Sequence, residues 1–151
     1  MIRSSRGRTA LSWSLVLLQF TLLGLLLWQS SLAALSWPAL SLMAAGASLG
    51  GWAIRAMRPG RFNIRPDIKP GAAMVSHAPY AVIRHPMYSA FLLVCAGLVL
   101  APFSLAKLCL WLLLLVVLMF KSVYEESLLK AHFPNYAAYR QRTWRFIPYF
   151  F

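Results

Sequence analysis

Two of the three acidic residues in this sequence are adjacent, Glu125 and Glu126, near the end of a long apolar run. The inner end of a membrane helix usually carries cations, because the helix dipole and anionic lipids both favour positive charge there. Lys121 lies one helical turn before Glu125, on the same face. The two acids are either a solvated pair that offsets nearby positive charge, or carboxylates that bind a ligand with hydroxyl groups or a positive centre.

A second polar cluster opens another apolar run, where the sequence reads Arg84-His85-Pro86-Met87-Tyr88. Proline suits the first position of a helix, so His85 is expected at the cap position and Tyr88 in the first turn. A helix start with free amides, beside an arginine and a histidine, is suited to bind an anion. The alternative interpretation is a belt of tyrosine and arginine at the membrane interface.

The third cluster lies in the C-terminal tail, where Tyr136 and Tyr139 share one helical face. These tyrosines either belong to an amphipathic segment on the lipid surface, or they close a lid over a pocket made by the other two clusters. Together the three clusters offer an anion site, a carboxylate and aromatic rings. That set suits a nucleotide-like cofactor, with an anionic end, ribose hydroxyls and an aromatic base, bound at a membrane surface.

Composition indicates which elements hold these clusters. The 151-residue chain is 60% hydrophobic and only 12% charged, which is typical of a membrane protein. Four apolar segments predict membrane spans at about residues 11–32, 37–57, 86–103 and 105–123. The last two are so closely joined that they predict a tight antiparallel helical hairpin. We therefore expect an all-α fold, a single integral membrane domain over residues 1–151, with about four transmembrane helices and a cytoplasmic helical tail.

Fifteen lysines and arginines against three acidic residues give a net charge of +12. Four spans would place all of these cations except Lys107 on one side of the membrane. This asymmetry predicts that both termini and the polar clusters are cytoplasmic, and it explains the charge without nucleic acid as a partner. The first apolar segment is longer than a signal-peptide core, so we expect a retained span. The brevity of the chain suggests a prokaryotic inner membrane.

Small residues in the second predicted span suggest close helix packing. Gly46 and Gly50 form a GxxxG pattern, which either packs against another helix of the same chain or forms the seam of a homodimer. Cys95 and Cys109 lie inside apolar runs without metal-ligand spacing. We expect both cysteines to pack as small hydrophobic residues, and we expect no metal site.

Two segments of the chain resemble a known family. The segments PYAVIRHPMYSAFLL (79–93) and EESLLKAHFPNYAAYRQRTWRFIP (125–148) resemble the isoprenylcysteine carboxyl methyltransferases and the related phospholipid-type methyltransferases. The resemblance covers about residues 71–149. It implies methyl transfer with S-adenosylmethionine as cofactor. It also implies a cytoplasmic pocket, formed by the last two helices and the tail, that is open to lipid for a lipophilic or prenylated carboxylate, thiol or amine.

The resemblance also assigns roles to residues. It implies that the cofactor is bound by Tyr80, Arg84, His85, Pro86, Met87, Tyr88, Glu125, Glu126, Tyr136 and Tyr139, with the choice between the two glutamates left open. The catalytic roles would fall to Glu125 and Lys121. In the family an arginine that holds the substrate often stands four residues before the glutamate, and Lys121 keeps its charge without its bidentate fork. We expect catalysis by positioning, without a strong base. The usual Phe-Gly of the family is Phe133-Pro134 here.

Two other functions remain open. Sterol reductases share a similar Arg-His-Pro-x-Tyr segment and an ending like Ile147-Pro148-Tyr149, which would imply a nicotinamide nucleotide as cofactor, but they are much longer chains. A non-enzymatic membrane adaptor is the other alternative. It predicts that His85, Tyr88 and Glu125 can be replaced without loss of ligand binding.

Overall fold

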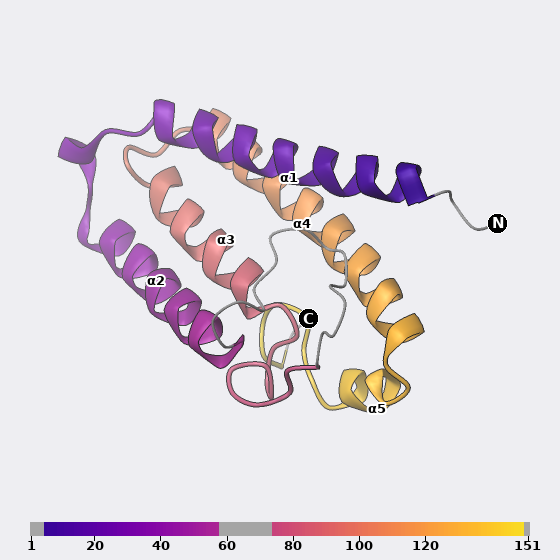
Figure 1. Cartoon of the computed structure of the whole chain (residues 1–151). Helices are drawn as coiled ribbons and strands as arrows, with labels where there is room; N and C mark the ends of the chain where they lie inside the picture. The colour runs from indigo at the N-terminus through magenta and orange to yellow at the C-terminus, as the bar shows by residue number, and fades with distance from the viewer. Residues whose placement is uncertain (1–4, 58–73, 150–151) are drawn as a thin grey trace.

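The computed structural model of the chain describes residues 5–57 and 74–149, with side chains from residue 9 onward. Within these ranges the fold is all-α, as predicted (Figure 1). The elements are α1 (Ser5–Trp28), the short 3-10 helix η1 (Leu32–Ala34), α2 (Trp37–Met57), α3 (Pro86–Val99), α4 (Leu105–His132) and α5 (Tyr136–Gln141). Residues 58–73 and the N-terminal arginine side chains, which carry part of the predicted charge asymmetry, lie outside the described residues.

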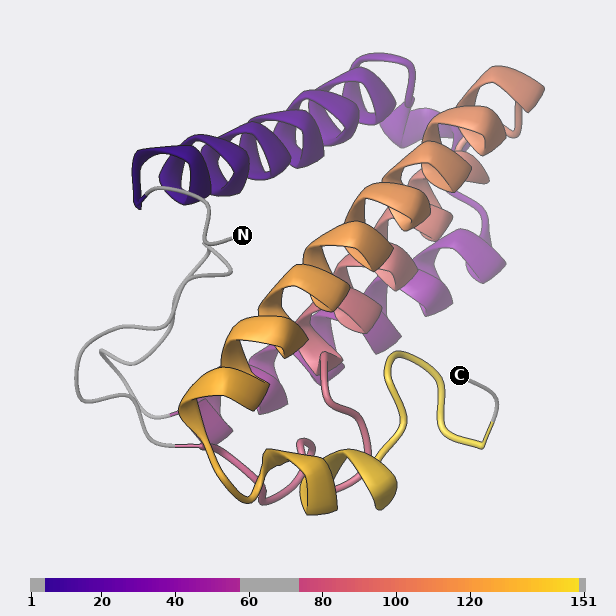
Figure 2. The ribbon, with the colours of Figure 1, turned by 90° about the vertical axis from the view of Figure 1, so that its right-hand side faces the viewer.

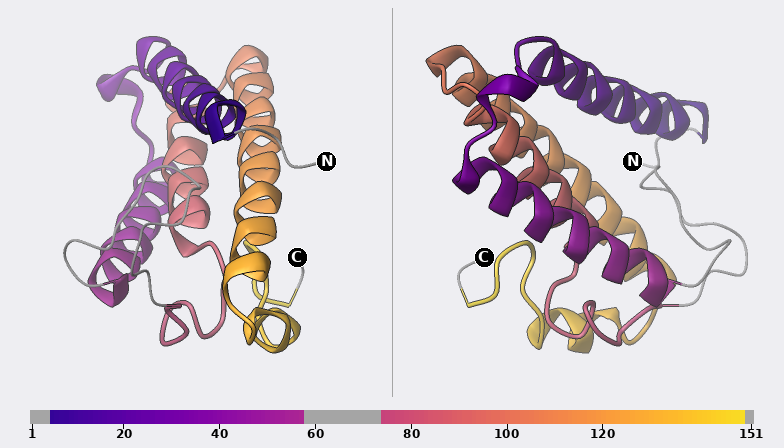
Figure 3. Two further views of the ribbon diagram at one scale, coloured as in Figure 1. Left: turned by 45° about the vertical axis from the view of Figure 1, so that its right-hand side comes forward. Right: turned by 90° about the vertical axis from the view of Figure 1, so that its left-hand side faces the viewer.

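Helix α3 packs between α2 and α4 (Figures 1 and 2). Helix α1 runs across α3 and α4 (Figure 3). Apolar side chains of α1, α3 and α4 form the main core, among them Leu26, Leu92, Cys95, Leu114 and Leu118. Cys95 therefore packs as a small hydrophobic residue, as predicted. Cys109, in contrast, is exposed on the outer face of α4.

Glycines allow α2 and α3 to approach closely. A Cβ atom added to Gly46 would lie 2.7 Å from the carbonyl oxygen of Ala90, and one added to Gly97 would lie 2.7 Å from that of Ala39. A Cβ atom on Gly50 would meet the Ala90 methyl group at 3.4 Å. The predicted GxxxG face is thus used within the chain, because a larger residue would push the helices apart. A homodimer through the same face would require α3 to give way.

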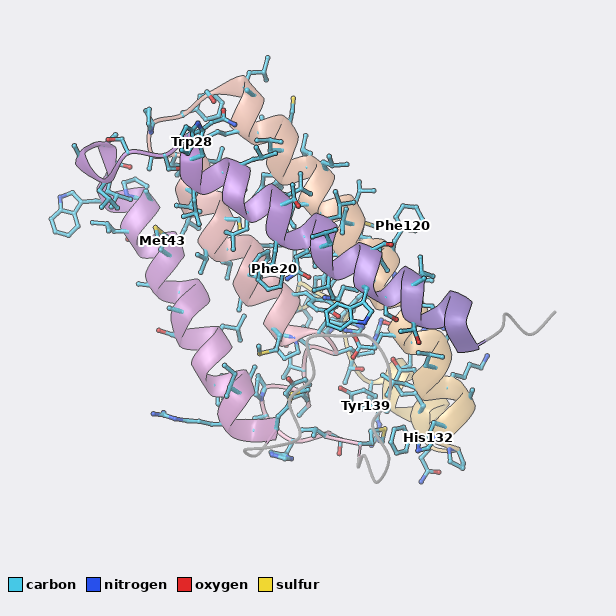
Figure 4. All side chains as sticks on the ribbon, turned by 45° about the horizontal axis from the view of Figure 1, so that its top comes forward. Phe20, Trp28, Met43, Phe120, His132 and Tyr139 are labelled. Carbon is cyan, nitrogen blue, oxygen red and sulfur yellow. The ribbon has the colours of Figure 1, made fainter. Side chains whose placement is uncertain are left out.

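Two helices in the described part of the chain are long and apolar enough to cross a membrane. These are Thr9–Trp28, with mean hydropathy 2.0, and Leu105–His132, with mean hydropathy 2.1. Helix α3 is apolar but has only 14 residues, or about 21 Å of helix, against a hydrocarbon core of about 30 Å. Large apolar side chains are exposed on α1 and α4, as Figure 4 shows for Trp28 and Phe120.

The C-terminal ends of α1, α3 and α4 differ from those of the predicted spans. Helix α1 ends at Trp28 instead of residue 32, and α3 ends at Val99 instead of residue 103. After α3 the apolar sequence continues into a turn, whereas the polar residues Gln29, Ser30 and Ser31 follow α1. Pro102 has no N–H with which to extend α3, and the N–H of Ser31 binds the carbonyl oxygen of Ala101 at 3.0 Å. Hydropathy marks the apolar run, and the run is longer than the hydrogen-bonded helix.

Helix α4 begins after Ser104, whose hydroxyl accepts the N–H of Lys107 at 3.2 Å. It continues beyond the predicted end of the span at residue 123 as far as His132, just before Pro134. Its length of 28 residues corresponds to about 42 Å, which is more than the apolar thickness of a bilayer. If the apolar layer of the membrane begins at the level of Leu105, the last turns of α4 therefore extend beyond it, toward α5.

Candidate active site

The C-terminal tail is hydrogen-bonded to the segment that precedes α3. Three backbone hydrogen bonds join them: Trp144 N–H to Val82 O (2.9 Å), Arg84 N–H to Trp144 O (2.7 Å) and His85 N–H to Arg145 O (3.1 Å). In Figure 2 the yellow tail returns from α5 to this segment. The tail thereby fixes the backbone at the start of α3, where the predicted site residues begin.

Glu126, near the end of α4, is the centre of a buried ionic cluster. Its Oε1 accepts hydrogen bonds from Arg84 Nε at 3.0 Å and Arg145 Nε at 3.1 Å. The same oxygen lies 3.2 Å from His85 Nε2. The more exposed Arg140 approaches the second oxygen to 3.8 Å. We call Glu126, Arg84, His85 and Arg145 the Glu126 clamp, because they connect α4, the segment before α3 and the tail.

Glu125 faces away from this clamp. Its Oε2 accepts a hydrogen bond from the Tyr88 hydroxyl at 2.8 Å and lies 3.6 Å from His85 Nδ1. The side chain of Glu125 is 28% exposed, against 7% for Glu126. The rings of His85 and Tyr88 are parallel, with their centroids 5.2 Å apart. The imidazole of His85 therefore lies between the two carboxylates, and Glu125 is on its more open side.

A pocket of about 240 Å³ lies beside Glu125. Its wall comes from the four long helices and from the segment before α3. The lining side chains are Gln19, Phe20, Met57, Tyr80, Arg84, His85, Pro86, Met87, Tyr88, Phe91, Lys121 and Glu125. Apolar surface with a few polar groups is the usual make-up of a small-molecule site. This pocket can therefore hold a molecule that has both apolar and charged parts.

Tyr80 contributes a buried hydroxyl group to the pocket. That hydroxyl has no hydrogen-bond partner within the described residues. Burial, followed by the charge of Glu125, raises the pKa of the Tyr80 phenol well above its usual range, so the group is a neutral donor. Buried polar groups normally have a partner. A ligand with a hydrogen-bond acceptor near Tyr80 would supply one, and in this respect the pocket fits a polar cofactor.

Tyr136 and Tyr139 are buried in the tail, and neither is among the residues that line the pocket. The hydroxyl of Tyr139, labelled in Figure 4, donates to the backbone carbonyl of Tyr80 at 2.7 Å. Burial raises the pKa of Tyr139 to about 12, and it also raises the pKa of Tyr136 above its usual value. The structure therefore places Tyr139 behind the pocket wall, where it supports Tyr80, and differs from the predicted lid.

Lys121 is buried and also lines the pocket. Its Nζ donates a hydrogen bond to Gln19 Oε1 of α1 at 2.7 Å and lies 5.2 Å from the centroid of the Tyr88 ring. Lys121 and Glu125, one helical turn apart on α4, do not form an ion pair in the described structure, because the Glu125 carboxylate is turned toward Tyr88. Lys121 thus has an amide oxygen and an aromatic ring as neighbours.

Comparison with known proteins places the chain in a family. Residues 35–136, which include all of α2, α3 and α4, match the family described as phospholipid methyltransferase. The chain belongs to the phospholipid methyltransferase family. No curated protein and no solved structure matches it significantly. The family match confirms the resemblance that the Arg-His-Pro-x-Tyr segment and the glutamate pair indicated, and the chain is thus a membrane methyltransferase by family.

The structure brings most of the residues predicted for this phospholipid methyltransferase into one pocket. Those that line it are Tyr80, Arg84, His85, Pro86, Met87, Tyr88, Lys121 and Glu125. Glu126 is in the clamp instead. The start of α3 also differs from the predicted anion site, because Glu126 already holds the guanidinium of Arg84, and tail carbonyls hold the amides of Arg84 and His85.

Other residues of the site were not predicted. Gln19 and Phe20 of α1 line the pocket although α1 lies outside the phospholipid methyltransferase match. A single amide in an apolar span is a recognisable signal for Gln19. Phe20 carries no such signal, because in the sequence an apolar residue that lines a pocket cannot be distinguished from one that faces lipid. The role of Arg145 depends on the path by which the tail returns to α3.

Proposed function

We propose that this chain is an S-adenosylmethionine-dependent methyltransferase that acts at the cytoplasmic face of a membrane on a lipophilic or prenylated acceptor. The observation that carries the proposal is the carboxylate of Glu125. It faces a pocket lined by the Arg-His-Pro-x-Tyr segment and accepts a hydrogen bond from Tyr88. The family match supports methyl transfer as the reaction. A carboxylate, a thiol or an amine would each be a suitable acceptor group.

The pocket residues suit the parts of such a cofactor. S-adenosylmethionine supplies a methyl group activated by a positively charged sulfur. The Glu125 carboxylate would accept hydrogen bonds from ribose hydroxyls or from an ammonium group. The unpartnered hydroxyl of Tyr80 would donate to an acceptor atom, and the stacked rings of His85 and Tyr88 offer a flat surface. The negative charge of Glu125 also favours a cationic ligand.

The chain's contribution to catalysis is positioning. Apolar side chains, among them Phe20, Met57 and Phe91, line the pocket and limit the access of water. Holding two reactants in the productive orientation can contribute as much as about 7–11 kcal/mol to lowering a barrier. Carboxylate and thiolate acceptors require no general base, and we assign none. Glu125 and Lys121 are the groups proposed to orient the reactants, from the two sides of the pocket.

The proposed orientation follows from charge and helix length. Helices α1 and α4 would cross the membrane, and α2 and α3 would complete a four-span bundle. The described cations near the pocket end include Arg55, Lys130, Arg140, Arg142 and Arg145. Lys107 is at the opposite end of α4. The positive-inside rule then puts the pocket on the cytoplasmic side, and we propose a prokaryotic inner membrane.

The test is calorimetric titration of the detergent-purified protein with S-adenosylhomocysteine, the product form of the cofactor. We expect saturable binding that weakens at least tenfold in Glu125→Gln. Lys130→Gln is the matched control, because it removes an exposed charge from the same helix and should leave affinity unchanged. NADPH is titrated in parallel, since a reductase would bind it instead.

Binding of NADPH without S-adenosylhomocysteine would overturn the proposal in favour of a reductase. Binding of neither ligand by folded protein would overturn it in favour of an adaptor. Equal affinity of wild type and Glu125→Gln for S-adenosylhomocysteine would leave the cofactor but remove Glu125 from its site.

A further inference from the structure

The pocket has a wall that the family match does not cover. Residues 35–136 match the family, but α1 supplies Gln19 and Phe20 to the lining. Gln19 is only 7% exposed. Its Oε1 accepts the hydrogen bond from Lys121 Nζ at 2.7 Å. An amide with this degree of burial in an apolar helix is unfavourable without a partner, and Lys121 is the partner it has.

Lys121 is the second half of the observation. The residue is 1% exposed, and no carboxylate in the described residues lies within 4.0 Å of its Nζ. Both acids of the same helix are engaged elsewhere, Glu125 by Tyr88 and Glu126 by the clamp. Burying an ammonium group without an anion is costly. An amide oxygen and an aromatic face reduce this cost but place no anion in direct contact with the ammonium.

We propose that Gln19 is a specificity-determining residue that positions the ammonium of Lys121 for an oxyanion on the methyl acceptor. The amide oxygen of Gln19 takes one N–H of Lys121, which leaves the others for a ligand in the pocket. The acceptor is then an amphiphile with an apolar chain and a carboxylate or phosphate group. The choice of glutamine matters, because a glutamate at position 19 would itself neutralise Lys121. This inference rests on the proposed function and adds the chemical class of the acceptor.

The position along α4 agrees with such an acceptor. Lys121 lies 16 residues after Leu105, about 24 Å along the helix axis, while Glu125 lies about 30 Å along it. For a span that starts at Leu105, Lys121 is thus inside the apolar layer and Glu125 is at its edge. Phe20 and Phe91 line the same pocket as Lys121. An anionic group at Lys121 would therefore keep its apolar chain in contact with apolar surroundings.

The experiment compares a fluorescent fatty acid, cis-parinaric acid, with its methyl ester, which has the same chain but no charge. Binding of each probe to the full chain in neutral detergent is measured by fluorescence titration. We expect wild type to bind the acid at least tenfold more tightly than the ester. In Gln19→Glu and in Lys121→Met that preference should fall to within twofold. Gln29→Glu is the matched control, because it adds the same charge at an exposed position in the turn just after α1.

Equal binding of acid and ester by wild type would overturn the inference, as would an acid preference that survives in Gln19→Glu. Gln19→Leu serves if the glutamate variant does not fold, and it should reduce the preference at least threefold without adding charge. Displacement of the acid by lysophosphatidate would indicate a phosphate head group, and displacement by a saturated fatty acid alone would indicate a carboxylate. Failure of wild type to bind S-adenosylhomocysteine would overturn the proposed function. That outcome is distinct, because the preference for the acid over the ester is measured without S-adenosylhomocysteine.

Discussion

Glu125 and Glu126 are consecutive residues of α4. His85 lies within 4.0 Å of both carboxylates. The carboxylate of Glu126 is 7% exposed and is bonded by Arg84, His85 and Arg145. The carboxylate of Glu125 is 28% exposed and, within the described residues, accepts one hydrogen bond, from Tyr88. Successive residues of a helix are about 100° apart around its axis. Glu126 therefore faces the tail, and Glu125 faces the pocket.

This difference shows how the charges at the pocket end of the molecule are divided. The arginines that reach the interior are neutralised by Glu126 and stabilise the fold. The pocket keeps one carboxylate on its clamp side and one ammonium, that of Lys121, on the side of α1. A ligand in the pocket would thus meet separated charges of opposite sign. The Glu126 clamp holds the segment before α3 and the tail against α4, whereas the charges in the pocket favour a ligand that has groups of both signs.

Removal of the clamp carboxylate should have the largest effect. Glu126→Ala leaves Arg84, Arg145 and His85 close together and largely buried without their anion. Loss of one partner of a buried ion pair typically costs about 3–5 kcal/mol. We expect a large fall in the thermal unfolding midpoint in detergent, together with faster proteolysis in the tail. Glu126→Gln keeps an acceptor and should lie between Ala and wild type. An unchanged midpoint for Glu126→Ala would contradict the clamp.

The pocket carboxylate should show the opposite pattern. Glu125→Gln removes a charge that we propose to hydrogen-bond the cofactor, and such bonds contribute about 1.5–3 kcal/mol. The affinity for S-adenosylhomocysteine should fall roughly 10- to 150-fold, with the unfolding midpoint of the ligand-free protein nearly unchanged. Calorimetry and thermal unfolding on the same samples separate the two effects. Equal losses of stability in the variants of both glutamates would remove the distinction between clamp and pocket.

Two arginines of the tail provide a finer test of the clamp. Arg145 is 15% exposed and donates to both oxygens of Glu126, at 3.1 and 3.2 Å. Arg140 is 56% exposed and comes no nearer than 3.8 Å. Arg145→Met should cost about 1–2 kcal/mol, whereas Arg140→Met should cost about 0.5 kcal/mol or less because water screens exposed pairs. Unfolding midpoints of the two variants would show this order, and the reverse order would mean that Arg140 is the clamp residue.

Much of this arrangement is readable from local sequence. Pro86 begins α3 as predicted, because a helix start tolerates the missing N–H. The apolar run from Trp37 to Met57 is one helix with the predicted bounds. Residues 84–88 and Glu125 meet at the pocket, and their types alone suggested a ligand site. Each of these features depends on neighbouring residues or on a pattern that spans one element.

The remainder depends on contacts between distant segments. The division of labour between Glu125 and Glu126 requires the position of Arg145, 19 residues further on, and of Arg84, 42 residues before. Likewise the partner of Lys121 is Gln19 on another helix. The prediction that Lys121 and Glu125 share one helical face followed from helix periodicity alone. Periodicity gives the face on which a side chain lies but not the competing partners that the fold brings to it.

The contact between the tail and the pocket wall should give the smallest effect. Tyr139→Phe removes the hydrogen bond to the Tyr80 carbonyl, which at neutral pH should cost about 0.5–1.5 kcal/mol. The phenol of Tyr139 has a pKa of about 12 in the docked tail, because it is buried, against 10.0 in the unfolded chain. Below pH 10 both forms are protonated and this stabilisation is complete. As the pH rises toward 12 the detached tail ionises first, so docking weakens.

The unfolding midpoint of wild type should therefore fall from about pH 10 upward, and the fall should be smaller in Tyr139→Phe. Part of it should remain, because burial also raises the pKa values of Tyr80 and Tyr136. Tyr149→Phe is the control, since Tyr149 is 86% exposed and its loss should not change the alkaline slope. If Tyr139→Phe and wild type lose stability in parallel above pH 10, then Tyr139 does not anchor the tail, and the clamp alone holds it beside the pocket.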